Sequence, residues 1–207
     1  MSKLLSVDEL FDRRHFDREV IILCVRWYLR DKLSFRDLVE MMAERGLPIA
    51  HTTIMRWVQR YAPQFEKRWN RFAIAPGRSW RVDETYLKIR GQWLYLYRAV
   101  DRDGKTVDFR LSLKREVAAA KAFFNKAIKN QRSAPTSITL DGYAASHLAV
   151  KLRIGAMLGF KVFSNAAITI AGVDLMRRIR KGQFNLGKLR IKEASAPAVW
   201  NAVLSTQ

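Results

Sequence analysis

The fold is decided by a stretch in the middle of the chain, W80-R-V-D-E-T-Y-L-K-I-R90. Its β-branched and aromatic residues alternate with polar ones, which is the period of a β-strand. Two similar stretches follow, W93-L-Y-L-Y-R-A-V-D101 and T106-V-D-F-R-L-S112, with the turn R102-D-G104 between them. Three strands joined by such short connections predict an antiparallel meander.

A helix and a fourth strand are expected after the meander. Residues 116–129 place apolar side chains at helical spacing, and S137-I-T-L-D141 is a short apolar run that ends in an aspartate. Three strands, a helix and then a fourth strand form the opening of the RNase H-like topology. We therefore predict an α/β fold for this part of the chain.

Two aspartates of these strands are candidate metal ligands. Asp83 stands in the middle of the first strand, and Asp141 ends the fourth. A carboxylate among apolar strand residues is costly to bury without a cation or a partner. Phosphoryl transfer on DNA by two metal ions needs carboxylates on neighbouring strands. The alternative for any strand aspartate is a turn cap or a surface position, and we assign Asp101, Asp103 and Asp108 to that group.

The first eighty residues favour helices. Apolar residues recur at helical spacing over 18–30, and S34-F-R-D37 is a capping-box-like start for a second helix. A third helix, H51-T-T-I-M-R-W-V-Q-R-Y61, is expected to end at Pro63. Two short helices joined by a tight turn, the second rich in Thr, Arg and Gln, are typical of a helix-turn-helix DNA reader. The alternative is a three-helix bundle with a solvated polar face.

The second helix of a helix-turn-helix meets the edges of DNA bases with its N-terminal end. The residues expected to contact DNA here are His51, Thr52, Thr53 and Arg56, with Gln59 and Arg60 closer to the phosphates. His51 taken alone fits the start of a helix as well as it fits a base contact.

The charge balance indicates a polyanionic partner. The 207 residues include Lys+Arg 38 against Asp+Glu 19, which gives a formal net charge of +19. The excess is spread along the chain, so a basic tail does not explain it. A ribosomal protein or a membrane-surface protein would share this balance. The hydrophobic content of 49% excludes a mostly disordered protein.

Cysteine usage and hydropathy point to the inside of a cell. Cys24 is the only cysteine, so an intrachain disulfide and a thiolate zinc cluster are excluded. Its neighbours Leu23 and Val25 favour a buried, inert thiol. No apolar run approaches the length of a membrane span, and the first residues contain no signal-peptide core. We therefore expect a soluble cytoplasmic protein with no membrane partner.

Seven strings along the chain carry a resemblance to a known family. They are R26-W-Y, L38-V-E-M-M-A-E-R-G46, T53-I-M-R-W-V-Q-R-Y-A-P63, S79-W-R-V-D-E-T-Y86, Y95-L-Y-R-A-V-D101, T139-L-D-G142, and L158-G-F-K with I168-T-I-A-G and R177-R-I-R-K-G-Q183. In this order, and over nearly the whole chain, they resemble the insertion-sequence-six family of bacterial DDE transposases. These enzymes move mobile elements by replicative transposition.

The resemblance implies metal-dependent DNA cleavage and strand transfer, with Mg²⁺ or Mn²⁺ as the cofactor. The family's first catalytic and metal-binding aspartate falls on Asp83 and its second on Asp141, with Glu84 in a supporting role. The implied partners are double-stranded DNA, both the terminal repeats of the element and the target, and further copies of the chain. The implied location is the bacterial cytoplasm, on the nucleoid or a plasmid.

The third carboxylate of the family is missing. It is normally a glutamate in a string like N-N-x-I-E-x-D-H, whereas here A144-A-S-H-L-A-V150 passes directly into K151-L-R-I-G155. We infer an internal deletion near 150/151. After Asp141 the only acidic residues are Asp174, in a helix with a basic end, and Glu193, in a basic stretch. Neither has the matching context. We therefore expect impaired catalysis, and the alternative is a non-catalytic DNA-binding remnant or a competitor of intact transposase.

These expectations divide the chain into three parts. Residues 1–63 are predicted to form a helix-turn-helix domain, and residues 64–79 a basic linker with a Pro-Gly break. Residues 80–207 are predicted to form an RNase H-like domain that is shortened internally.

Overall fold

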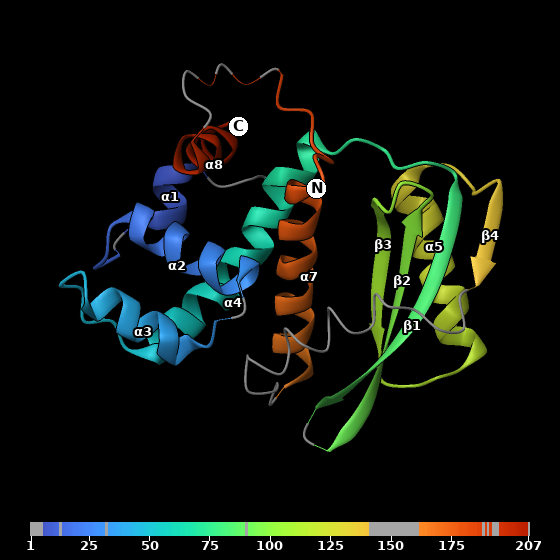
Figure 1. Ribbon diagram of the computed structural model, residues 1–207, viewed down its shortest axis with the longest axis horizontal. Helices are drawn as coiled ribbons and strands as arrows, with labels where there is room; N and C mark the ends of the chain where they lie inside the picture. Colours follow the sequence, from blue (N-terminus) through green and yellow to red (C-terminus); the bar gives the residue numbers. More distant parts are fainter. Residues whose placement is uncertain are drawn as a thin grey trace.

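The sheet, with one helix packed on it, lies at one end of the molecule, and most of the other helices lie at the opposite end (Figure 1). The computed structural model describes residues 6–12, 14–31, 33–89, 91–140, 162–187, 189, 191 and 195–206. The helices are α1 (Val7–Phe11), α2 (Arg18–Arg30), α3 (Phe35–Ala43), α4 (His51–Trp69), the 3₁₀ turn η1 (Asn70–Phe72), α5 (Val117–Gln131), α7 (Phe163–Arg180) and α8 (Ala196–Ser205). The strands are β1 (Ser79–Ile89), β2 (Gln92–Asp101), β3 (Thr106–Ser112) and β4 (Ser137–Leu140).

Local hydrogen bonds define the start of α3. The Ser34 hydroxyl accepts from the Asp37 backbone N–H at 3.2 Å, and the Asp37 carboxylate accepts from the Ser34 N–H at 2.7 Å. This reciprocal pair is the predicted capping box, and such a cap contributes about 1 kcal/mol. After α3 the chain reverses at Gly46, whose φ of +72° is a conformation that glycine adopts without strain.

The predicted end of the third helix at Pro63 is wrong, because α4 continues through Pro63 to Trp69. An internal proline removes one backbone hydrogen bond and costs roughly 3 kcal/mol. The extra turns bury Phe65 and Trp69 almost completely. Burial of two such side chains contributes about 1.5–3 kcal/mol each, which is enough to offset the proline. The first residues of the expected linker are therefore part of a core helix.

The sheet confirms the predicted meander and adds a parallel strand. Its order is β3-β2-β1-β4, with antiparallel pairs β1–β2 and β2–β3 and a parallel pair β1–β4. A parallel neighbour needs a crossover connection, and α5 supplies it between β3 and β4. This order of strands and helix is the opening of the RNase H-like fold.

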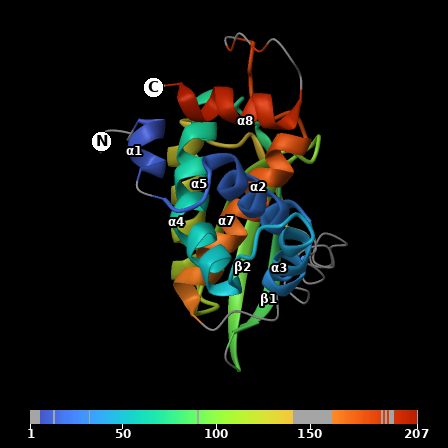
Figure 2. The same cartoon turned by 90° about the vertical axis from the view of Figure 1, so that its left-hand side faces the viewer.

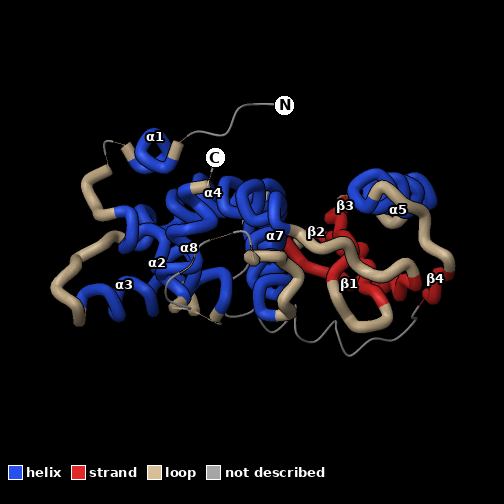
Figure 3. Tube along the Cα trace, turned by 90° about the horizontal axis from the view of Figure 1, so that it is seen from above, coloured by secondary structure: helices blue, strands red, loops and turns tan. Residues whose placement is uncertain are grey.

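Two different helices cover the two faces of the sheet (Figure 3). On one face, α5 packs its Phe123 with Trp80, Val82 and Ala99 in a small separate core. The other face presents Leu87, Leu94 and Leu96 to the larger core, which also contains buried residues of α7 and of the N-terminal helices. One hydrophobic core therefore runs from the first helices of the chain to the sheet.

The C-terminal helices pack on the N-terminal ones. Helix α7 lies along α4 (Figure 2), and it approaches α2 so closely that a Cβ added at Gly172 would lie 2.7 Å from both Leu29 methyl groups. In α8, the indole of Trp200 contacts the rings of Phe65 and Trp69. The division of the chain at residues 63 and 79 stays a prediction. The N-terminal helices and the C-terminal helices α7 and α8 share one hydrophobic core.

Two further expectations concern Cys24 and the membrane. Cys24 is buried in the core, as predicted. Within the described ranges, no helix combines the length and the apolarity that crossing a bilayer requires.

Candidate nucleic-acid interface and carboxylate site

Helix α4 turns its polar side outward at its N-terminal end. Ile54, Trp57 and Val58 are buried against the helices behind, so the residues between them face solvent. The predicted DNA contacts all lie on this outer side: His51, Thr52, Arg56 and Arg60 are exposed, and Thr53 and Gln59 are half-buried. The helical period thus separates a core stripe from a polar stripe, as a helix-turn-helix requires.

The start of α4 has neither a side-chain cap nor an acidic residue, although the Thr53 N–H donates to the Ala50 carbonyl at 2.9 Å. The first N–H groups of a helix have no partner within it, and they form the positive end of the helix dipole. The N-terminal end of α4 is therefore suited to an anion.

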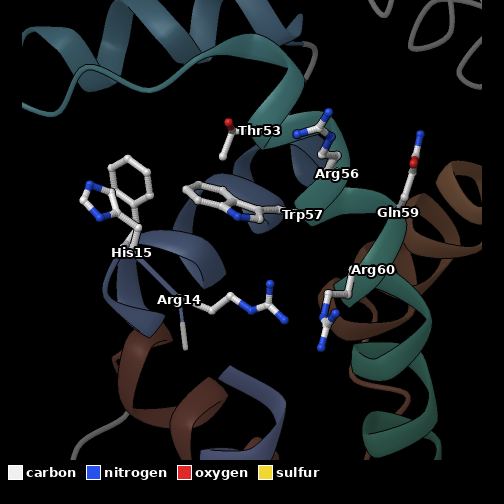
Figure 4. A pocket seen from close by; sticks show the side chains of 8 residues that line it. Arg14, His15, Thr53, Arg56, Trp57, Gln59 and Arg60 are labelled. Atoms are coloured by element: carbon white, nitrogen blue, oxygen red, sulfur yellow. The ribbon is translucent and has the colours of Figure 1, made fainter. Parts of the chain in front are cut away.

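A hollow beside α4 collects residues from two segments (Figure 4). Arg14, His15 and Phe16 come from the connection between α1 and α2, and the others come from α4. Its lining residues are Arg14, His15, Phe16, Thr53, Arg56, Trp57, Gln59 and Arg60. The polar residues of α4 were expected from the sequence, whereas the connection was not. The one sequence feature that could have indicated a role for this connection is the basic cluster just before the helix at 18–30.

Asp83 lies on the sheet face that α7 covers. It is half-buried, and its direct partner across the β1–β2 ladder is Arg98, which is only 7% exposed. Opposed residues in an antiparallel pair point to the same face, with Cβ atoms about 4.5–5.5 Å apart. Asp141, the second predicted ligand, lies outside the described residues. Whether the chain brings the two aspartates together therefore stays a prediction.

Glu84 does not share the face of Asp83. Successive side chains of a strand point to opposite faces, and the Glu84 carboxylate accepts a hydrogen bond from Arg115 Nε at 3.2 Å. The same carboxylate raises the pKa of the Arg115 guanidinium. A supporting role for Glu84 would have to act through the strand and not through contact with the Asp83 carboxylate.

Asp174 is a structural residue of α7. It is 8% exposed, and it accepts a hydrogen bond from Thr106 Oγ1 at 3.1 Å. Burial raises the pKa of its carboxyl group, and Arg98 and Arg178 oppose that rise. Because Thr106 belongs to β3, Asp174 lies two strands from β1, on the side away from β4. Strands are about 4.8 Å apart, so this position does not complete a cluster around Asp83.

The remaining strand aspartates have structural partners. Asp101 caps its turn, since its carboxylate accepts from the N–H groups of Gly77, Asp103 and Lys105. Asp108 is neither a turn cap nor a surface residue, so that expectation is wrong. It is 8% exposed and accepts from Lys126 Nζ and Asn130 Nδ2, both at 2.8 Å. A strand next to a lysine-bearing helix can bury a carboxylate because the lysine compensates its charge.

The residues in place do not by themselves fit a divalent cation. In the part of the chain that the structure describes, no group of three or more His, Cys, Asp or Glu side chains could hold a metal. Asp83 contributes one carboxylate, and its cross-strand neighbour is a cation. Two-metal sites need several carboxylates around one position, so no cleavage step is derived from these residues alone.

Comparisons with known proteins agree with this geometry. A family model described as a DDE domain matches residues 77–153, which contain the whole sheet. The chain is 40% identical over 140 residues to the transposase for insertion sequence-like element IS431mec of Staphylococcus aureus (strain N315), covering 68% of this chain and 62% of that protein. It is 39% identical, over the same length and shares, to the transposase for insertion sequence element IS257 in transposon Tn4003 of Staphylococcus aureus.

A shorter match extends to another organism. An uncharacterized protein of Yersinia pseudotuberculosis, pYV0051, is 43% identical over 51 residues, which are 25% of this chain and 48% of that protein. The chain spans less than two thirds of the length of the curated transposases that it matches, 62% in each case. Its DDE domain, its strand order and this identity make the chain similar to the transposases of bacterial insertion sequences.

Proposed function

We propose that this chain binds the terminal repeats of a mobile element through α3, the following turn and α4, and that it cleaves DNA weakly or not at all. The observation that carries the proposal is the outer side of α4. Every residue expected to contact DNA lies there, beside an uncapped helix start. The net charge of +19 supports a polyanionic ligand.

The expected loss of cleavage rests on the carboxylates. The family site would hold Mg²⁺ or Mn²⁺ between Asp83, Asp141 and a glutamate, and such ions stabilise the charge that develops during phosphoryl transfer. This chain lacks the string that contains the glutamate. Asp174, an acidic residue of α7, is buried and hydrogen-bonded to β3. With two carboxylates the displacement loses much of its electrostatic support.

A binding measurement tests the DNA reader. The full chain would be titrated into a labelled duplex carrying the element's own end, and into a duplex of scrambled sequence. Arg56→Ala should reduce the preference for the element's end by roughly tenfold, because a base-edge contact of arginine contributes about 1–3 kcal/mol of discrimination. Lys121→Ala on α5 removes the same charge from the far side of the sheet, and it should leave the preference unchanged (Figure 3).

Either of two results would contradict the proposed reader. One is an equal affinity of the wild-type chain for both duplexes. The other is an unchanged preference in Arg56→Ala, which would mean that another element reads the sequence.

A cleavage measurement separates the two hypotheses for this copy. The end-bearing duplex would be incubated with the chain and Mg²⁺ or Mn²⁺, with Asp83→Ala as the control. We expect specific binding without nicking, as in a remnant or a competitor of intact transposase. Nicking that disappears in Asp83→Ala would instead show that a complete site forms, and the chain would then be a working strand transferase.

A further inference from the structure

We infer that the hollow beside α4 is a phosphate clamp in which Arg14 and Arg60 hold one backbone phosphate of the DNA that α4 reads. The inference rests on the proposed function, and it assigns a new role to the connection between α1 and α2. The ligand of the hollow is then a phosphodiester group of the bound duplex. A free inorganic anion is the other source of the same chemistry.

The first observation is the charge of the lining. Arg14, Arg56 and Arg60 approach one hollow from two segments, and Figure 4 shows Arg14 reaching across it toward Arg60. Among the lining residues that the structure describes, none is acidic, and the described part of the chain offers no ion pair to any of these three arginines. Three like charges around one space repel each other, and an anion between them offsets that repulsion.

A second cleft in the described part of the chain has a different charge pattern. That cleft lies between α4, β3, α5 and α7, and both signs of charge line it. Lys126 and Arg178 are balanced there by Glu66, Asp108 and Asp174. These two cations thus have acidic neighbours in their cleft, whereas the arginines of the hollow have none among its lining residues.

The second observation is the anchoring of the connection on α4. The Phe16 ring contacts the Trp57 ring edge-on, with centroids 5.4 Å apart at 78°, and His15 contacts Phe16 in the same way at 5.0 Å. Directly after them, the Asp17 carboxylate caps α2 by accepting from the Glu19 N–H at 2.6 Å. The connection is thus fixed at both its aromatic residue and its helix start. A group held in its binding position loses less entropy when it binds.

The position of the hollow selects a backbone phosphate as the ligand. Thr53, Arg56 and Gln59 belong both to the outer side of α4 and to the lining of the hollow. A strand whose bases meet the start of α4 therefore passes its backbone over the hollow. Phosphate contacts position a reader on the duplex, and they are indifferent to sequence. The clamp should thus contribute affinity and no preference.

This division of roles sets the test, in which Arg14→Ala and Arg56→Ala are measured on the element's end and on scrambled duplex over a range of salt. Arg14→Ala should lose about five- to tenfold in affinity on both duplexes and reduce the slope of log K against log salt by about 0.9, the value for one phosphate. Its preference for the end should stay unchanged. Arg56→Ala should lose preference instead. Arg14 is exposed, so its removal leaves the core intact.

Replacing one backbone phosphate at a time by an uncharged methylphosphonate can locate the phosphate that the clamp binds. Single methylphosphonate substitutions along the end-bearing duplex should include one position that weakens binding by the wild-type chain much more than binding by Arg14→Ala. Phe16→Ala should lower affinity without changing the number of charges, and Phe16→Trp should restore it. Circular dichroism would establish that each variant is folded.

The outcomes distinguish the clamp from the proposed function. If the wild-type chain prefers the element's end but Arg14→Ala keeps the wild-type affinity and salt slope, the clamp is wrong and the reader stands. If the wild-type chain has no preference, the proposed reader itself fails. A third outcome is that inorganic phosphate, at matched ionic strength, displaces DNA from the wild-type chain and not from Arg14→Ala, while no single methylphosphonate substitution weakens binding. The hollow would then bind a free anion, and the assignment to a backbone phosphate would be overturned.

Discussion

Asp83 and Arg98 face each other across the β1–β2 ladder, on the sheet face that α7 covers. The carboxylate expected to bind a metal therefore has a buried cation as its nearest cross-strand neighbour. Burial raises the pKa of Asp174 on α7, and the same arginine opposes that rise, so Arg98 is within electrostatic reach of two carboxylates. Arg98 is thus a counter-ion for the interior of this sheet face, whatever else Asp83 binds.

Replacement of Arg98 should destabilise the protein in a pH-dependent way. Arg98→Met keeps much of the stem and removes the charge, so Asp174 is left buried with less compensation. Leaving a buried carboxylate with less compensation should cost about 1–3 kcal/mol. Urea unfolding at pH 8 should show that loss, and Arg102→Met in the exposed turn should change stability by less than about 0.5 kcal/mol.

The sign of the pH effect follows from Asp174. Burial raises its folded-state pKa above the unfolded value, so its ionised form lowers the stability of the fold. This penalty is absent below the unfolded pKa of about 4 and grows as the pH rises above it. The difference between wild type and Arg98→Met should therefore shrink toward pH 4. An equal loss at both pH values would mean that Arg98 acts by packing alone.

The ion pair between β3 and α5 should contribute measurably to stability. Asp108→Ala leaves Lys126 and Asn130 without their shared acceptor, although Lys126 Nζ still donates to the Phe109 carbonyl at 2.7 Å. Because the Lys126 side chain is 40% exposed, water replaces part of the lost interaction, and the expected loss is about 1–3 kcal/mol. Asp103→Ala is the matched control, since that carboxylate is 74% exposed. Equal urea midpoints for the two variants would contradict the structural role of Asp108.

The contact between α2 and α7 should show coupling in a double-mutant cycle. A methyl group at Gly172 would meet the Leu29 side chain at 2.7 Å, so the fully buried Leu29 would have to shift into its packed surroundings. Overpacking costs about 1–3 kcal/mol, of which the better helix propensity of alanine returns about 1 kcal/mol. Gly172→Ala should therefore be destabilising in the wild-type chain.

The same substitution should be neutral or stabilising when Leu29 is small. Leu29→Ala alone should cost about 2–5 kcal/mol, because it leaves a cavity, and the methyl group that Gly172→Ala adds can fit into that cavity. Denaturant unfolding of the four proteins gives the coupling energy. Additive effects would mean that α2 and α7 do not approach each other as the structure describes.

Local patterns were enough to predict several elements. Alternation of residues predicted β1, β2 and β3, and the S34-F-R-D37 string predicted the cap of α3, because these features depend on neighbours in sequence. The start of α4 at His51 follows from the proline-containing connection before it. The outward position of Arg56 then follows from the helical period.

Other features depend on contacts that a single pattern does not contain. The continuation of α4 beyond Pro63 depends on what Phe65 and Trp69 pack against, including Trp200 at the other end of the chain. Arg14 and Arg60 line the same hollow, and the contact between the Phe16 and Trp57 rings holds the two segments together there. The free energy gained when distant segments pack together can override local propensity, and a local sequence pattern does not give the size of that free energy.

Cys24 offers a probe of the helical core that needs no added label. Burial raises the pKa of its thiol to about 11, and only the thiolate reacts with disulfide reagents. At pH 8 the thiolate fraction in the folded chain is on the order of one in a thousand. Labelling of the native protein should therefore be slow. At high reagent concentration its rate should become equal to the rate of unfolding.

In a Cys24→Ala background, Leu113→Cys supplies an exposed thiol that should react at the rate of a free cysteine, since Leu113 is 58% exposed. If Cys24 reacts as fast as this control in the folded chain, the helices that bury it open without global unfolding, and the core shared by α2, α4, α7 and α8 is not the stable part of the molecule.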